Sequence, residues 1–399
     1  MKKRIEKEVA LAYDDVAIIP SSISRINHRT ECNPFDENGF LPIFASPMST
    51  VVNESNFSLF EENKIIPILP KTNDITLETR IKYSTNGKWA AYSLDEFESI
   101  FANTDSKMNL TSKTYVLIDI ANGHMKRTFD LVEIAKKMYG DNIIIMVGNI
   151  ANHETYYYAT KSGVDYIRVG IGNGEGCLTY DLTGVNYPMA SLIEKMVEFK
   201  EYARASLGNS MKLPKIVADG GIRNFRDVNK ALAIGADYVM IGGLFARLYE
   251  SASPCLLYNV YSEFMSSLSG LNIPIETKSG TELLSDPNFE YSDKPKYKGK
   301  NVVVEKMFYG MASKNGQEDR NNEQKVPEGL AKRVQASMRM SDWVEIMEHS
   351  LKCVMSYSDS ANLEEFRNKA TLTRISEWAI WGLGKRETLD IVKPYGVDV

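Results

Sequence analysis

The sequence predicts an α/β protein built on one (β/α)8 TIM barrel with added segments. Short apolar runs alternate along the chain with stretches of helical periodicity, and this alternation is typical of a parallel sheet. Eight such runs each end in a polar or glycine-rich turn, which is where the active-site loops of a barrel lie. An open doubly wound sheet is the second interpretation, but no GxGxxG motif opens the first expected strand–helix turn, as that fold would favour.

The elements are assigned in order from apolar runs, read as buried strands, and from the helical patterns that follow many of them. Strands are expected at Leu41–Ser46, Ile65–Leu69, Trp89–Ser93, Tyr115–Ile120, Ile143–Gly148, Tyr166–Gly170, Lys215–Asp219 and Tyr238–Ile241. Helices are expected at Ser55–Asn63, Leu94–Asn103, His124–Tyr139, Asn152–Ser162, Met189–Leu207 and Asn224–Ile234. Together they predict a catalytic barrel over residues 41–375.

Several segments fall outside this count. Residues 1–40 form an N-terminal extension, and residues 250–305, which contain Ser-Gly-Thr and Asp-Lys-Pro-Lys turns, form an insertion after the last strand. Residues 312–335 are polar, and we expect either a plain linker or a flap that closes over the active site. A C-terminal helix is expected near 341–356, and residues 376–399 form a tail.

Composition excludes several function classes. The 399 residues are 43% hydrophobic and 25% charged with a net charge of -5, which argues against a nucleic-acid binder or a partner of acidic membranes. No apolar run is long enough to span a bilayer, and the charged N-terminus shows no secretory signal. The four cysteines are widely spaced without a CxxC pair, so neither a disulfide framework nor a zinc site is indicated. We therefore expect a cytoplasmic protein.

The segment from Arg168 to Thr179 is the strongest indication of chemistry. Glycines at 170, 172, 174 and 176 follow a short apolar strand and lead to Cys177, with the Thr179 hydroxyl two residues on. Alternating glycines let the backbone approach a ligand closely, which a core strand does not need. A lone thiol on such a loop is placed to attack a bound electrophile, whereas a buried filler cysteine is the plainer interpretation.

Two glycine pairs, Gly220-Gly221 and Gly242-Gly243, follow the last two expected strands. In a barrel these loops commonly bind a phosphate through backbone N–H groups and a helix N-terminus. Asp219 precedes the first pair and, when ionised, is an acceptor suited to sugar hydroxyls; alternatively it caps the helix expected near Asn224. A cysteine beside a phosphate site and a sugar-binding carboxylate indicates a nucleotide attacked at its base.

Nine short motifs, taken in order, resemble the IMP dehydrogenase/GMP reductase family over roughly residues 10–375. They are Leu11–Val16, Pro47–Val51, Asp119–His124, Gly148-Asn149, the loop around Cys177, Ala218–Gly221, Ile241–Gly243, Phe308–Met311 and Val326–Gly329. The resemblance implies a barrel enzyme that moves hydride between C2 of a purine nucleotide and a nicotinamide cofactor, NADPH or NAD. It also implies a homo-oligomer, with a homotetramer expected, and no nucleic-acid or membrane partner.

The resemblance also implies roles for individual residues. Cys177 would add to C2 of the purine, and Thr179 with Glu328 would form a proton-transfer dyad. Asp219 would hold the ribose, Gly221, Gly243 and Tyr309 the phosphate, and Met311 would pack near the base. The other nucleotide-binding residues would be Glu175, Gly220, Gly242, Gly310 and Gly329. Asp119, Ala121 and Asn149 would lie near the nicotinamide. Carbonyl groups of Gly172, Gly174 and Cys177 match those that bind potassium in the dehydrogenases.

The direction of the reaction is a separate question. IMP dehydrogenases usually carry CBS modules between the second and third strands, and the gap from Leu69 to Trp89 is too short for them. The flap of the dehydrogenases supplies an Arg-Tyr pair that activates water, and here Arg320 is followed by Asn321. We therefore predict an NADPH-dependent GMP reductase, converting GMP to IMP and ammonia. An IMP dehydrogenase and a non-catalytic member that binds a purine nucleotide are the alternatives.

Three positions depart from the family pattern. Glu175 stands where a small hydroxyl residue usually contacts the phosphate, and a carboxylate there would repel a dianion. Ser49 stands where the family more usually has an acidic or polar residue after Pro-Met. The histidine expected after the second strand is missing from the stretch Ile68–Lys71. Either Lys71 or Arg247 neutralises Glu175, or the substrate carries an altered or missing phosphate.

Overall fold

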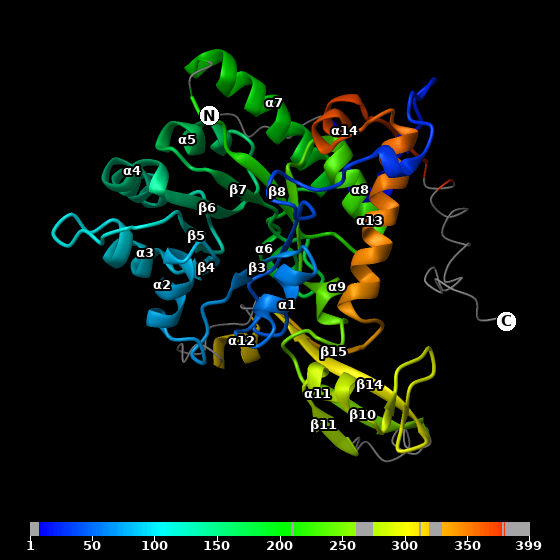
Figure 1. The fold of residues 1–399 in the computed structure, drawn as a ribbon. Helices are drawn as coiled ribbons and strands as arrows, with labels where there is room; N and C mark the ends of the chain where they lie inside the picture. The colour runs from blue at the N-terminus through cyan, green and yellow to red at the C-terminus, as the bar shows by residue number, and fades with distance from the viewer. Residues whose placement is uncertain are drawn as a thin grey trace.

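The computed structural model describes residues 8–208, 211–260, 274–310, 313–318, 329–376 and 379. The barrel strands are β2 (Ile43–Ala45), β3 (Ile66–Leu69), β4 (Trp89–Tyr92), β5 (Thr114–Asp119), β6 (Ile143–Ile150), β7 (Tyr166–Val169), β8 (Lys215–Asp219) and β9 (Tyr238–Ile241). They close into one barrel in sequence order, because β2 pairs in parallel with β9 as well as with β3. The predicted (β/α)8 barrel is confirmed (Figure 1).

Helices surround the barrel and follow its strands (Figure 1). They are α1 (Phe57–Glu62), α2 (Leu77–Thr85), α3 (Leu94–Phe101), α4 (Lys126–Tyr139), α5 (Thr155–Ser162), α6 (Thr179–Thr183), α7 (Met189–Leu207), α8 (Phe225–Ile234) and the short α9 (Gly243–Ala246). Helix α2 is absent from the sequence-based assignment. The long α13 (Met340–Tyr357) lies beside α8 and takes the position of the eighth barrel helix.

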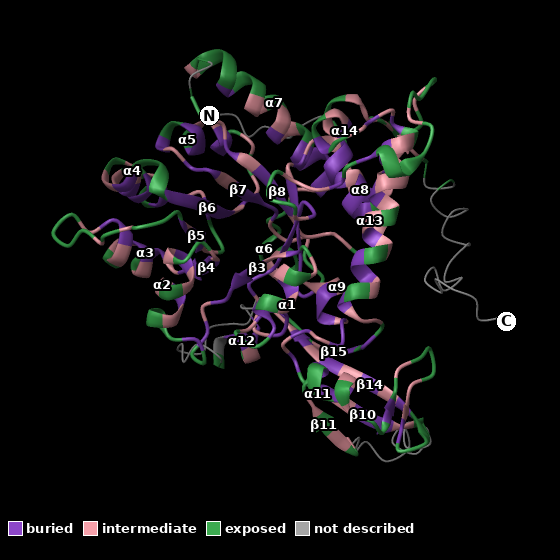
Figure 2. Cartoon of the chain, viewed as in Figure 1, coloured by how far each residue is buried: buried purple, intermediate pink, exposed green. Residues whose placement is uncertain are grey.

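The interior of the barrel is packed with aromatic rings at the end where the strands begin. Phe44 packs against Trp89 with ring centroids 5.6 Å apart and against Tyr238 at 5.2 Å. Trp89 and Tyr238 are the first residues of their strands, so these rings fill the amino end of the barrel. Figure 2 shows the barrel strands as buried and the outer faces of the surrounding helices as exposed. These rings leave no open space at the amino end of the barrel interior.

The predicted insertion and part of the predicted flap form a second sheet that projects from the barrel at the lower right of Figure 1. Its elements are β10 (Cys255–Asn259), β11 (Glu276–Lys278), α11 (Gly280–Ser285), β12 (Phe289–Glu290), β13 (Lys296–Tyr297), β14 (Lys300–Tyr309) and β15 (Ala331–Gln335). Strand β14 pairs with β10, β13 and β15. The end of the segment 312–335 is therefore a sheet strand, and its start contains the short helix α12 (Lys314–Glu318).

The two ends of the described chain meet. Strand β1 (Val16–Ile19), from the N-terminal extension, pairs antiparallel with β16 (Thr371–Arg374), which follows α14 (Leu363–Lys369). The remaining elements of the described chain are the 3-10 turns η1 (Tyr13–Asp15), η2 (Arg29–Glu31) and η3 (Gly140–Asn142). The tail 376–399 lies almost wholly outside the described residues. Among the helices that the structure describes, none has the length and apolar character needed to cross a membrane.

Candidate active site

A cavity of about 500 Å³ opens at the carboxyl end of the barrel strands. Its size falls within the range of small-molecule sites. The lining residues include Ser46, Met48, Lys71, Asp119, Ala121, Asn149, Arg168, the loop from Gly170 to Cys177, Thr179, Asp219, Gly220, Gly221, Gly242, Gly243, Phe308, Gly310 and Gly329. The loops after β7, β8 and β9 thus converge on one site, as the glycine pattern predicts.

Cys177 lies on the loop between β7 and α6, and its Sγ donates to Thr179 Oγ1 at 3.2 Å. The loop folds back on itself, because the backbone N–H of Cys177 donates to the carbonyl of Gly174 at 3.0 Å. The thiol and the hydroxyl that the sequence places two residues apart are therefore in contact at the cavity wall.

A second segment, Gly329 and Leu330 just before β15, binds the loop that carries Cys177. Cys177 forms an antiparallel bridge with Gly329. The next residue, Leu330, donates its backbone N–H to the carbonyl of Gly176 at 3.0 Å. The chain that leads into β15 therefore fixes the position of the loop that carries the thiol.

A network of buried charges forms the floor of the cavity. Arg168 donates through Nε to Asp219 Oδ2 at 2.9 Å and through Nη1 to Asp119 Oδ1 at 2.8 Å. Asn149 donates to the same Asp219 oxygen and to the carbonyl of Gly170, each at 2.8 Å. Lys71 contacts Asp119, with its Nζ 3.5 Å from Oδ2. The network therefore fixes the polar side chains of β5, β6, β7 and β8 relative to one another.

Each charge in this network is stabilised by an opposite partner. Burial by itself raises the pKa of Asp119, but the positive charges of Lys71 and Arg168 outweigh it and hold that pKa below its ordinary value. Burial lowers the pKa of Arg168, and the charges of Asp219 and Asp119 more than offset this, so the pKa rises. Asp119 and Arg168 are therefore ionised at neutral pH.

Asp219 does not cap a helix, which was the alternative to its role at the sugar. The N-cap of α8 is Asn224, whose side chain accepts from the N–H of Asp227 at 3.2 Å. Asp219 instead lines the cavity and is held by Arg168 and Asn149 through Oδ2. Its predicted contact with a ribose stays a proposal.

Glu175 lies among positive side chains at the edge of the cavity. Its Oε1 accepts from Arg247 Nη2 at 3.1 Å and from Lys332 Nζ. Burial raises the pKa of Glu175, but Lys332 and Arg247 together bring it below its ordinary value. The expectation that Arg247 neutralises Glu175 is confirmed, whereas the alternative partner Lys71 is wrong, since Lys71 contacts Asp119 instead.

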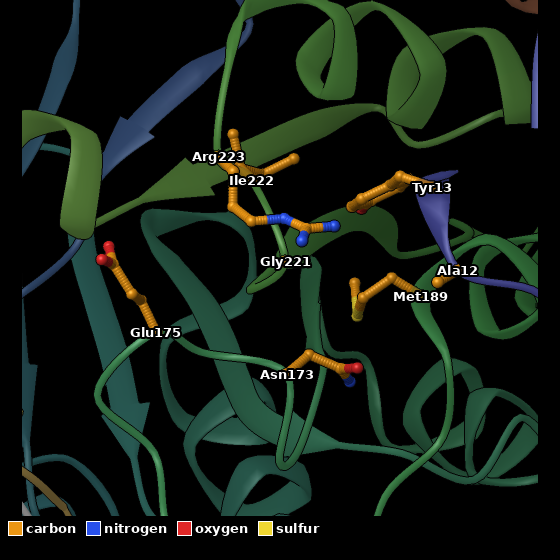
Figure 3. Close-up of a pocket in the computed structure, with 8 residues that line it drawn as sticks. All are labelled: Ala12, Tyr13, Asn173, Glu175, Met189, Gly221, Ile222 and Arg223. Atoms are coloured by element: carbon orange, nitrogen blue, oxygen red, sulfur yellow. The ribbon is translucent and has the colours of Figure 1, made fainter. Parts of the chain in front are cut away.

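A smaller cavity of about 210 Å³ adjoins the first beyond Glu175. Figure 3 shows Tyr13 and Met189 on one side of it and Glu175 on the other. It shares Asn173, Glu175, Gly221 and Ile222 with the main cavity. The position of Glu175 is thus a point where the two cavities meet.

The predicted site residues divide into three groups. Those that line the main cavity are Cys177, Thr179, Glu175, Asp219, Gly220, Gly221, Gly242, Gly243, Gly310, Gly329, Asp119, Ala121, Asn149, Gly172 and Gly174. Tyr309 is not among the lining residues, and its neighbour Phe308 is, because successive side chains of β14 point to opposite faces. Arg320, Glu328 and Met311 lie outside the described residues.

Three residues of the site have no role in the sequence-based prediction. Arg168 is a charged residue within an apolar strand, and a buried charge needs partners of opposite charge. The sequence therefore could have identified it as a candidate site residue. Phe308 could be found from the alternation of β14 once that strand is recognised. Lys332 has no local signal, because it meets Glu175 from 157 positions away in the chain.

Comparison with known proteins agrees with the motifs. The family model described as the IMP dehydrogenase / GMP reductase domain matches residues 102–271. The GMP reductase of Staphylococcus epidermidis is 31% identical over 269 residues, covering 64% of this chain and 78% of that enzyme. The GMP reductase of Helicobacter pylori is 30% identical over 269 residues with the same coverage. The chain belongs to the IMP dehydrogenase/GMP reductase family.

Both enzymes named in the family are represented among the relatives. The inosine-5'-monophosphate dehydrogenase of Cryptosporidium parvum is 32% identical over 262 residues, which cover 65% of this chain. The chain spans about half of that dehydrogenase, 54% of its length. Both names denote oxidoreductases, so this member of the family is an oxidoreductase.

Proposed function

We propose that this chain reduces a guanine-type purine at C2 with loss of ammonia, the reaction of a GMP reductase. The observation that carries the proposal is Cys177, whose thiol lies in the cavity beside the hydroxyl of Thr179. A thiol opposite a bound purine can attack an electrophilic ring carbon. The glycine loops and Asp219 on the same cavity support a substrate that carries a sugar.

The proposed chemistry runs in two steps at one carbon. Cys177 as thiolate forms a bond to C2, and the amino group at C2 leaves as ammonia after taking up a proton. A hydride then adds to C2 and the bond to sulfur breaks, which regenerates the thiolate. Thr179 is within hydrogen-bond reach of the thiol, and Glu328 is its proposed partner in moving the proton.

The hydride requires a nicotinamide cofactor, for which we propose NADPH, with NAD as the alternative. Asp119, Ala121 and Asn149, the residues expected near the nicotinamide, line the same cavity as Cys177. Asp119 and Asn149 are held in place by Arg168 and Asp219, so this wall is preorganised. When bound, the cofactor would supply the hydride, while these residues orient it and exclude water.

The reductase direction is supported by the connection between β3 and β4. It contains only α2, Leu77–Thr85, and so has no space for the additional modules of the dehydrogenases. Coverage of the relatives agrees, since the matches extend over 78% of two GMP reductases and 54% of the dehydrogenase. The identity to that dehydrogenase, 32%, keeps IMP oxidation as the second candidate.

The test is a pair of assays that follow the absorbance of reduced nicotinamide. In one, the protein receives NADPH with GMP or guanosine; in the other, it receives NAD with IMP or inosine. Oxidation of NADPH with release of ammonia supports the reductase. Reduction of NAD would assign the dehydrogenase, and no change in either assay, with purine binding intact, would assign a non-catalytic binding protein.

Three further expectations are proposals. A potassium ion would be held by carbonyl groups of Gly172, Gly174 and Cys177, although the carbonyl of Gly174 already accepts from Cys177. Rates measured in potassium and in sodium salts test this. We also propose a homotetramer in the cytoplasm, and light scattering of the purified protein tests the oligomeric state.

A further inference from the structure

We propose that the substrate is a purine nucleoside with a free 5'-hydroxyl, and that Glu175 selects it by taking the place of a 5'-phosphate. This proposal rests on the proposed function, because it concerns the far end of the same substrate. Glu175 would be a specificity-determining residue. The substrate class would be nucleosides, whereas the names of the relatives refer to nucleoside monophosphates.

The position of Glu175 is the first argument. In (β/α)8 barrels a phosphate commonly binds to the loops after the last two strands. Here the last strand ends at Ile241, and a methyl group added to Gly243 would collide with Oε2 of Glu175. The carboxylate therefore lies against the backbone that a phosphate would approach.

The charges around Glu175 are the second argument. Arg247 and Lys332 are cations at this edge that could bind a phosphate, and both donate to Oε1 of Glu175. A phosphate dianion placed beside them would face a carboxylate that is ionised at neutral pH, since these cations lower its pKa. Repulsion between the two anions opposes binding.

The neighbouring side chains give a third argument. Phe308, the residue of β14 that lines the cavity, offers no hydroxyl to a phosphate. Arg223 is the one positively charged side chain among the described residues that line the smaller cavity, and its guanidinium already contacts Asp14. A phosphate extended into that cavity would still face Glu175, and Arg223 is already paired with Asp14, so the second space is no better for a dianion.

A nucleoside avoids these costs. Both hydrogen bonds that Glu175 accepts within the described chain go to Oε1, and Oε2 faces Gly243 at the cavity edge. A 5'-hydroxyl donates one hydrogen bond and carries no charge, so it suits a carboxylate oxygen. Arg247 and Lys332 then act as positioning residues, because they hold Glu175 in this orientation.

The alternative is that a phosphate displaces Glu175 and takes over its two cations. The two interpretations make opposite predictions for the wild-type protein, and the first also predicts the behaviour of the charge-neutral variant Glu175→Gln and of Glu175→Ser. If Glu175 excludes the phosphate, either change improves binding of a monophosphate. If a phosphate normally displaces it, the wild-type protein already prefers the monophosphate.

Calorimetric titration with guanosine and with GMP, and with inosine and IMP, decides between them without turnover. We expect the wild-type protein to bind each nucleoside about tenfold or more tightly than its monophosphate. Glu175→Gln and Glu175→Ser should reduce or reverse this ratio. Glu62→Gln, which removes an exposed carboxylate at the end of α1, should leave it unchanged.

Tighter binding of the monophosphates by wild-type protein would overturn the proposal for Glu175 and leave the proposed function standing. An unchanged ratio in both Glu175 variants would also overturn it. If no purine binds to the folded wild-type protein, both the proposed function and this inference fail. Because the wild-type ratio is itself a test, misfolding of a variant would not rescue the proposal.

Discussion

Among the single residues, Cys177 is the group on which the proposed chemistry depends. We expect Cys177→Ala to lower kcat by roughly 10³-fold or more, because no other thiol on the loop can form the bond to C2. Binding of the purine should persist, since the glycine loops and Asp219 are unchanged. Steady-state rates and calorimetric binding of the same preparation measure the two effects.

The matched control is Cys353→Ala, which removes a half-buried thiol on α13 whose sulfur accepts from Arg29 at 3.6 Å. Its rates should equal those of the wild type. Full activity in Cys177→Ala would contradict a covalent step at this residue.

Arg168 connects two carboxylates beneath the cavity and is expected to matter for stability. Arg168→Met leaves Asp119 and Asp219 without their shared cation, and breaking such a buried pair costs about 3–5 kcal/mol. The free energy of unfolding from urea titration measures the loss. As a control, Arg127→Met removes contacts with Asp95 and Glu98 on the surface, and exposed ion pairs of this kind contribute little to stability. Equal losses in the two variants would contradict the account of the network.

Among the elements, the segment before β15 is expected to control the cysteine loop. Leu330→Pro removes the N–H that donates to the carbonyl of Gly176, so kcat should fall while the midpoint of thermal unfolding changes little. Leu330→Ala keeps the N–H and truncates a side chain that is 51% exposed, so its rate should remain near that of the wild type. A similar rate in both variants would show that this hydrogen bond does not position the loop.

The elements differ in how far the sequence could predict them. All eight barrel strands are found near their expected positions, because each is a short apolar run followed by a polar turn. Helix α2 is missed for a physical reason: the residues it buries are Arg80 and Ser84, so it lacks the apolar periodicity by which helices are recognised. Arg80 is stabilised instead by Glu96, at 2.6 Å.

The second sheet was predicted only as an insertion. Its longest strand, β14, pairs with β10, β13 and β15, and the pairings with β10 and β15 join segments that are distant in sequence. Such register depends on tertiary contacts rather than on a local pattern. The same limit applies to the site, where the cysteine and glycines could be predicted but the contact between Glu175 and Lys332 could not.

For the molecule as a whole, the buried charges predict how stability depends on pH. The pKa of Asp119 in the folded chain lies below its ordinary value of 3.8, so its contribution is full above that value. It is lost as the pH falls through the lower, folded pKa. The difference in unfolding free energy between wild type and Asp119→Asn should therefore be constant near neutral pH and shrink below about pH 4. A difference that grows on acidification would contradict this assignment.

Transfer of a label from the cofactor decides whether hydride reaches C2 of the purine through the Cys177 adduct. The protein is incubated with NADPH deuterated at C4 of the nicotinamide and with guanosine or GMP, and the purine product is analysed at C2. We predict deuterium at C2 of a hypoxanthine product, one ammonia for each NADPH oxidised, and neither in Cys177→Ala. Oxidation of NADPH without label at C2, or product formation that persists in Cys177→Ala, would contradict the account.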